Sequence, residues 1–163
     1  GDIYPALEKG TIDAAEWIGP YDDEKLGFYK VAKNYYTPGW WEPSSQFSFF
    51  VNLAEWNKLP KQYQEAFEVA AAEVNLNMMA EYDAKNPQAL RRLIANGVTL
   101  HRYPVELMRA AQKAAFEFYD EEAAKNAAFR KIFTAWRKVR EDAQTWFGVA
   151  EQSYDSFASA NKV

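Results

Sequence analysis

Alternating apolar and polar positions predict β-strands at four short places in the chain. The clearest is segment 46–52, whose sequence QFSFFVN places Phe47, Phe49 and Val51 on one face. Weaker candidates are a short strand within residues 10–17, between the end of a helix and a loop, and residues 31–37 and 98–102; Pro38-Gly39 ends the strand at 31–37. We expect the rest of the chain to be mainly helical.

Helical periodicity predicts helices on both sides of these strands. Residues 2–10 form a short amphipathic pattern that ends at Gly10, and residues 22–30 read as a short polar helix or turn. After a helical turn at 54–58, Pro60 suits the first position of a long helix that we expect to reach Ala84. Asn86-Pro87 is predicted to begin another helix, which Asn96-Gly97 closes.

The stretch from Pro104 to Phe147 carries a nearly continuous helical pattern. A single helix of that length would span roughly 65 Å, which is more than a domain of this size can cover. Its apolar stripe would then need a second domain or another subunit. The phase of the stripe changes near Asn126, which predicts either the cap of a second segment or a kink.

Composition narrows the class of protein. Hydrophobic residues make up 48% of the 163 residues and aromatic residues 17%, which supports a packed core and excludes a disordered chain. The net charge of −4 argues against generic binding to nucleic acid or to anionic membranes. Cysteine is absent, which excludes disulfides, thiol catalysis and cysteine-based zinc sites. Because the sequence opens within a helical pattern and without Met, we expect a fragment of a longer protein.

Two glutamates beside tryptophans are the strongest chemical candidates. They occur in Glu16-Trp17 and in Trp40-Trp41-Glu42, each in a predicted loop. Carboxylates suit hard cations such as sodium or calcium, and a large ring gives a small-molecule site an apolar wall. The alternative is a pair of surface acids at the starts of loops. Of the paired tryptophans we expect one to face a cleft and the other to be buried.

The sequence around these pairs resembles that of a known protein family. Residues 1–43, GDIYPALEKGTIDAAEWIGPYDDEKLGFYKVAKNYYTPGWWEP, resemble the periplasmic solute-binding proteins of TRAP transporters, and most closely the branch that binds 2-oxo acids such as pyruvate with a sodium ion. Weaker similarity continues through 85–97 and 145–157. The resemblance implies an α/β fold: the helix-rich C-terminal lobe of a periplasmic binding protein of the type II-like class, with few strands and a long C-terminal helix.

The resemblance also implies a site. Glu16, Glu42 and the backbone carbonyl of Trp17 would hold a cation, with sodium favoured over calcium, and Trp17 and Trp41 would contact the ligand. Tyr21 and Gln46 could reach the site without a firm role. The arginine that clamps the ligand carboxylate in this family lies upstream of the matching region. No arginine of this chain lies in a matching context, and five of them fall in predicted helices: Arg91, Arg92, Arg130, Arg137 and Arg140.

The implied protein is a periplasmic receptor and not an enzyme. Residues 1–103 would form a partial ligand-binding lobe with hinge strands, and residues 104–163 a long helix and tail that spans lobes or a dimer interface. Its partners would be a small carboxylate, the TRAP membrane permease and a second copy of the chain. His101, the single histidine, lies in a predicted strand and offers no evident general base. Two alternatives stay open: a helical interaction module without a small ligand, and a glycosidase that uses the two glutamates.

Overall fold

A computed structural model describes residues 1–42, 44–45 and 47–161. The chain divides into two compact units, Gly1–Tyr103 and Pro104–Val163. The first unit contains seven elements in the described residues. They are α1 (Ile3–Glu8), α2 (Pro20–Leu26), the 3-10 turn η1 (Phe28–Lys30), β1 (Asn34–Thr37), α3 (Leu53–Lys58), α4 (Lys61–Ala95) and β2 (Thr99–Arg102).

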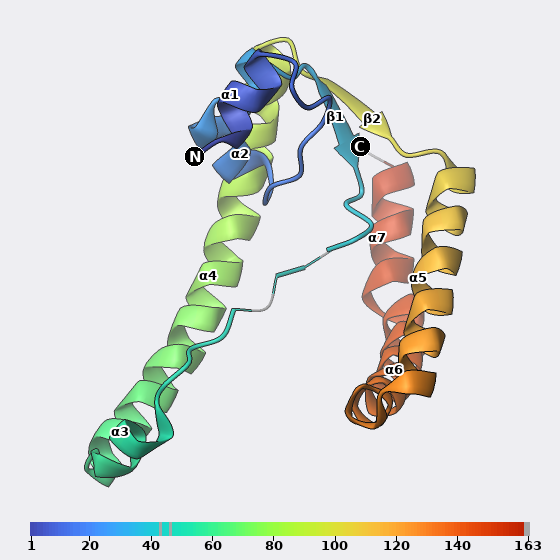
Figure 1. Ribbon diagram of the computed structural model, residues 1–163. Coiled ribbons are helices and arrows are strands. Elements are labelled where there is room, and N and C mark those ends of the chain that lie inside the picture. The colour runs from blue at the N-terminus through green and yellow to red at the C-terminus, as the bar shows by residue number, and fades with distance from the viewer. Residues whose placement is uncertain (43, 46, 162–163) are drawn as a thin grey trace. The chain divides into compact units, whose positions relative to one another are not determined.

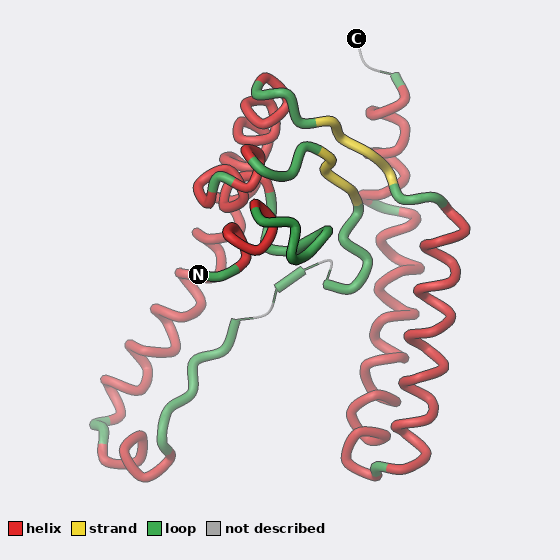
Figure 2. The backbone as a smooth tube through the Cα atoms, turned by 45° about the horizontal axis from the view of Figure 1, so that its top comes forward, coloured by secondary structure: helices red, strands yellow, loops and turns green. Residues whose placement is uncertain are grey.

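A small parallel sheet and the end of the longest helix organise the first unit. Strands β1 and β2 lie side by side, with Asn34 opposite Thr99 and Thr37 opposite Arg102 (Figures 1 and 2). Helix α2 packs against the C-terminal half of α4, and the small core lies there. Ala89, Leu93 and Val98 are its buried members, with exposed fractions of 0%, 2% and 5%.

The strand prediction was right at two places and wrong at two. Strands β1 and β2 confirm the candidates at 31–37 and 98–102, with shorter bounds. Residues 47–52 and 10–17 form no strand, and Gln46 lies outside the described residues. A strand needs a neighbouring ladder for its backbone groups, and no described strand lies beside either segment. The predicted apolar face of 47–52 is instead exposed, by 64% at Phe47 and 66% at Phe49.

Helix α4 runs through the proline at which we expected a boundary. It is one helix of 35 residues with Pro87 inside it, so the predicted break between Ala84 and Asn86 is wrong. A proline inside a helix removes one backbone hydrogen bond and crowds the preceding turn. Tertiary contacts around it offset this, because Asn86 accepts a hydrogen bond from the Tyr21 backbone (3.0 Å) and Ala89 is buried one turn later. The predicted end is confirmed at Gly97, where φ is +85°.

The second unit is a helical hairpin with a short third helix. Helices α5 (Val105–Lys125), α6 (Ala127–Val149) and α7 (Glu151–Ala160) follow one another, so the single 104–147 helix does not form. Asn126 caps α6, as one alternative predicted: its side chain accepts hydrogen bonds from the backbone N–H groups of Ala128 (3.0 Å) and Phe129 (3.1 Å). The chain then turns back and packs α6 on α5 (Figure 1).

This hairpin satisfies part of the apolar stripe internally. The rings of Tyr119 in α5 and Phe133 in α6 lie 5.5 Å apart, and Phe133 is 8% exposed. Arg137 of α6 forms an ion pair with Asp120 of α5 at 3.2 Å. The two helices therefore cover each other, which a straight helix could not do. Apolar residues remain exposed along α6, among them Ile132 (70%) and Trp146 (63%).

Removing the cap at Asn126 tests this turn. We expect Asn126→Ala to lower the free energy of unfolding of the second unit by about 1 kcal/mol, because two N–H groups lose their acceptor. Asn126→Asp keeps an acceptor and should change the free energy little. Urea unfolding followed by far-ultraviolet circular dichroism measures both variants. Equal losses in both would show that the cap bonds do not stabilise the hairpin.

Candidate functional site

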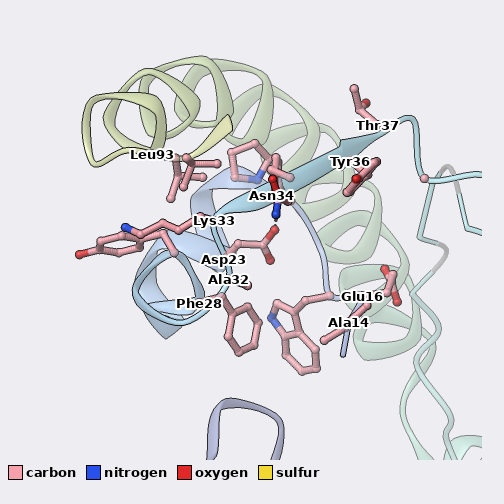
Figure 3. A pocket seen from close by; sticks show the side chains of 18 of the residues that line it. Ala14, Glu16, Asp23, Phe28, Ala32, Lys33, Asn34, Tyr36, Thr37 and Leu93 are labelled. Carbon is pink, nitrogen blue, oxygen red and sulfur yellow. Dashed lines mark hydrogen bonds between the residues drawn. The ribbon is translucent and has the colours of Figure 1, made fainter. Parts of the chain in front are cut away.

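The first unit contains a hollow of about 750 Å³. Its walls are the loop from Ile12 to Gly19, the segment from Phe28 to β1, and the apolar end of α4 at Leu90 and Leu93 (Figure 3). Val98, Leu100 and Tyr103 complete the lining from the β2 side. Both apolar and polar groups line it, as in sites that bind small molecules.

The local sequence explains why residues 12–19 form a loop that lines this hollow. Gly10 takes a positive φ of +67°, which ends α1. Gly19 and Pro20 begin α2, with the proline at the start of the helix where no intrahelical N–H is needed. Between them the chain has no regular structure, so the side chains of Glu16 and Trp17 are presented from a loop.

The structure brings three of the four predicted site residues to this hollow. Glu16, Trp17 and Trp41 line it, and the two tryptophans are 44% and 45% exposed. Glu42 follows Trp41 directly but is outside the lining, and its carboxylate lies 3.5 Å from the hydroxyl of Ser45. The structure therefore places Glu42 near the hollow in sequence without placing its carboxylate inside it.

Both members of the tryptophan pair are exposed. Trp40 is 41% exposed and packs edge-on against Trp41, with the ring centres 4.7 Å apart. Tyr103 lies 6.3 Å from Trp41 on another side. The expectation that one tryptophan of the pair is buried is wrong, since both side chains are exposed by more than two fifths in the described chain.

The donor set at the loop fits a hard cation. Within the described residues, no backbone hydrogen bond uses the carbonyl of Trp17, so that oxygen is free to accept another partner. Carboxylate and carbonyl oxygens are the ligands that sodium and calcium take in proteins. The described residues contain no group of three or more His, Asp or Glu side chains suited to a metal. A cation here would thus need, besides carboxylates, the Trp17 carbonyl and oxygens of the bound small molecule to complete its coordination.

The charges around the hollow favour a cation over a bare carboxylate. Its described lining carries Asp13, Glu16 and Asp23 against the single ammonium group of Lys33. That group donates to the Asn96 carbonyl at 3.0 Å and is partly occupied by this bond. Such an excess of negative charge attracts cations and repels a free carboxylate. No arginine is in the described lining.

The predicted arginines lie in helices, as expected, and two of them are paired. Arg92 of α4 binds both carboxylate oxygens of Glu24 at 2.7 Å, and Arg137 pairs with Asp120. The pair with Arg92 lowers the pKa of Glu24. None of these guanidinium groups is available at the hollow in this structure.

Of the two secondary candidates, Tyr21 has structural contacts elsewhere and Gln46 lies outside the described residues. His101, in which we expected no general base, also has contacts of its own. The hydroxyl of Tyr21 accepts from Lys85 at 3.2 Å, and its ring packs edge-on against Tyr82 of α4. The ammonium groups of Lys25, which lies 3.7 Å from the centre of the Tyr21 ring, and of Lys85 lower the pKa of Tyr21. His101 stacks on Tyr36 at 4.9 Å, and its Nε2 lies 2.9 Å from the Asn34 side-chain oxygen.

Sequence reasoning missed a buried acid in the wall of the hollow. Asp23 is 8% exposed, and its Oδ2 accepts a 2.6 Å hydrogen bond from the Tyr35 hydroxyl. Burial raises the pKa of Asp23, and burial beside this carboxylate raises the pKa of Tyr35. Nothing in the sequence PYDDEKL distinguishes Asp23 from its neighbours, because the distinction arises from its burial and from its hydrogen bond to Tyr35, which is 12 positions away.

None of the described helices combines the length and apolar character needed to cross a membrane.

Comparison with known proteins identifies the family. The family model described as bacterial extracellular solute-binding protein, family 7, matches residues 1–126. A monocarboxylate 2-oxoacid-binding periplasmic protein of Nostoc sp. is 51% identical over 162 residues, which are 99% of this chain and 44% of that protein.

Solved structures agree with this similarity. A TRAP transporter solute-binding protein from Bordetella bronchiseptica, described as a dimer with calcium and picolinate in one site, superposes with a TM-score of 0.94 and 54% identity over 98% of this chain and 48% of its own. TRAP proteins from Colwellia psychrerythraea, with calcium and pyruvate, and from Pseudoalteromonas atlantica, with sodium and pyruvate, give TM-scores of 0.90 and 0.89. Their identities are 32% and 34%, over 95% and 96% of this chain and 48% of each of theirs.

These relatives confirm the predicted fold class, a helix-rich α/β lobe of a periplasmic binding protein. The chain spans about half the length of the relatives that it matches. The match to the family model extends over more than three quarters of the chain and includes the whole of the Glu16–Trp41 region. The chain therefore belongs to the bacterial extracellular solute-binding proteins of family 7.

Proposed function

We propose that the natural gene product carrying residues 1–163 is the periplasmic solute-binding subunit of a TRAP transporter. It captures a small 2-oxo monocarboxylate such as pyruvate together with a cation, and it delivers this ligand to a membrane permease without chemical change. The observation that carries the proposal is the hollow at which Glu16, Trp17 and Trp41 meet. Relatives that hold pyruvate with calcium or sodium support it.

Different residues of this chain would bind the cation and contact the ligand. Glu16, Glu42 and the Trp17 carbonyl would hold the cation, which supplies positive charge for the ligand carboxylate and the 2-oxo oxygen. The negative lining makes this charge necessary, because Asp13, Glu16 and Asp23 would otherwise repel an anion. Exclusion of water would strengthen the attraction by lowering the local dielectric constant. Trp17 and Trp41 would limit the size of the ligand with their rings.

We propose sodium as the cation, with calcium as the competing outcome. The relative from Pseudoalteromonas is described with sodium and the one from Colwellia with calcium, both beside pyruvate. Two carboxylates and a carbonyl suit either ion. A direct comparison of the two ions in one protein is therefore part of the test.

We also propose that residues 104–163 contribute to contacts between lobes or to a homodimer. Within α6 and α7, the exposed apolar residues Ile132, Val139, Trp146 and Phe157 offer surface for such contacts. The relative from Bordetella is described as a dimer. The hairpin of α5 and α6 replaces the single long helix in this proposal.

Calorimetric titration of pyruvate into the natural gene product tests the function. We expect binding in sodium or calcium buffer, and its loss in choline buffer with a chelator. Equal affinity for pyruvate with and without these metal ions would show that no cation takes part in binding. No binding of pyruvate or of longer 2-oxo acids in any buffer would contradict the proposed function and favour the interaction-module alternative.

A further inference from the structure

Helices α5 and α6 form a basic groove within the second unit, with a volume of about 370 Å³. The turn capped by Asn126 brings the two helices side by side (Figure 1). Two cationic side chains from each helix line the groove: Arg109, Lys113, Arg137 and Arg140. Glu141 is the single carboxylate in the described lining. Since the whole chain has a net charge of −4, this positive charge is a local feature of the hairpin.

Aromatic rings hold the two arginines of α6 in place. The guanidinium carbon of Arg140 lies 5.1 Å from the centre of the Phe116 ring and 5.8 Å from that of Trp136. The guanidinium carbon of Arg137 lies 5.7 Å from Phe116 and 5.3 Å from Phe133. Cations within about 6 Å of a ring centre are attracted by the ring face. Because both arginines are already ordered by these contacts, binding a partner would cost less side-chain entropy.

Acidic side chains of the hairpin neutralise the groove only in part. Two of its cations have partners in α5: Arg137 with Asp120 at 3.2 Å, and Lys113 with Glu117 at 3.7 Å. All four of these side chains are exposed by more than two fifths, and ion pairs this exposed contribute little. Neither Arg109 nor Arg140 forms an ion pair with an acidic side chain of the described residues.

We propose that this basic groove is a docking site for an acidic segment of a partner protein, whose carboxylates bind between the cations of α5 and those of α6. The planar fork of an arginine can bind both oxygens of one carboxylate. Arginine and aromatic side chains are also the types enriched at the centres of protein interfaces. The inference goes beyond the proposed function and does not depend on it, because the groove shares no residue with the hollow.

The charges and their exposure favour a protein segment over other occupants. None of the four cations is buried, so a small anion would form only weak, exposed ion pairs with them. A segment with several carboxylates contacts all four at once. The net charge of −4 disfavours an anionic membrane surface. The apolar residues proposed for a homodimer are outside the described lining of the groove: Ile132, Val139, Trp146 and Phe157.

Calorimetric titration of an acidic peptide into the natural gene product tests the proposal. The probe is a capped oligoglutamate peptide, and an oligoglutamine peptide of the same length is its control. At low ionic strength we expect only the oligoglutamate peptide to bind, and added salt should weaken its binding by screening the exposed charges. Arg140→Gln and Arg109→Gln should each lower the affinity by at least about fivefold, the loss expected at the centre of an interface.

The same helix offers a matched control. Arg130 belongs to α6 but is outside the described lining, so Arg130→Gln removes the same charge at another place. It should change the affinity by about twofold at most, as for an exposed charge without a direct contact. Arg140→Lys keeps the charge and loses the planar fork, so its affinity should lie between those of the wild type and Arg140→Gln.

Three results would overturn the proposal. One is equal binding, or no binding, of the two peptides. Another is an equal loss of affinity in Arg130→Gln and in the groove variants, which would show general attraction by charge. The third is unchanged peptide binding by Arg140→Gln and Arg109→Gln with loss of self-association, measured by sedimentation, or of binding to phosphatidylglycerol vesicles. That result would make a second copy or a lipid surface the occupant. If the oligoglutamate peptide binds but no 2-oxo acid does, the proposed function alone fails.

Discussion

Replacing Glu42 by glutamine is expected to weaken cation-dependent pyruvate binding by about 100-fold or more in the natural gene product. Loss of a residue that only orients a metal ligand lowers metal affinity by about 10–100-fold, so loss of a ligand itself should reach at least the upper end. Glutamine keeps the size of the side chain and one oxygen but removes the charge that a hard cation needs. Glu16→Gln should behave in the same way.

Glu42 is the sharper of these two tests because its carboxylate is outside the lining of the hollow in this structure. Glu55→Gln is a suitable control, since Glu55 is an exposed residue of α3 paired with Lys58 at 2.7 Å. Calorimetric titration at saturating sodium, and again at saturating calcium, measures the dissociation constants. Wild-type affinity in Glu42→Gln, together with loss in Glu16→Gln, would remove Glu42 from the site and keep the loop.

Leu93→Ala is expected to lower the free energy of unfolding by about 2–5 kcal/mol, the range for large-to-small substitutions in a core. Leu93 is 2% exposed, lines the hollow from α4 and shares the small core with Ala89 and Val98. Because few described side chains are buried this deeply, little else can close around the lost volume. We expect the same variant to reduce ligand binding through partial unfolding of the wall.

Leu76→Ala on the same helix provides the comparison. Leu76 is 68% exposed, so its truncation should change the free energy by no more than about 0.5 kcal/mol in a surface environment. Urea denaturation followed by tryptophan fluorescence measures both variants. Comparable losses would mean that residue 76 is covered in the natural gene product and that the core extends further along α4 than it does here.

Local signals predicted most helix ends correctly. Gly10, Gly97 and Asn126 each end or begin a helix where expected, because a positive φ or a side-chain cap is a property of a few consecutive residues. The expected polar helix at 22–30 was only partly right, because α2 begins at Pro20 and ends at Leu26, and the 3-10 turn η1 follows at Phe28–Lys30. The ends of these helices are set by neighbouring residues in the sequence and need no contact with a distant part of the chain.

Features that depend on distant partners were predicted less well. Segment 47–52 has the pattern of a strand but lacks a neighbouring strand in the described chain, and α4 continues through Pro87 because Tyr21 and the core hold both sides of it. The paired tryptophans are both exposed for a similar reason, since only covering groups could bury one of them. In each case the outcome was decided by contacts that no local pattern records.

The sequence by itself determined the family, the helical character of the chain and the site candidates Glu16, Trp17, Trp41 and Glu42, because these follow from short motifs and the residues around them. Only the tertiary structure decided that α6 folds back on α5 and that Glu16, Trp17 and Trp41 share one hollow. It also singled out Asp23 from the acids around it. Burial of Asp23 and its hydrogen bond to Tyr35, 12 positions away, give that residue its chemistry, and both depend on contacts that form only in the folded chain.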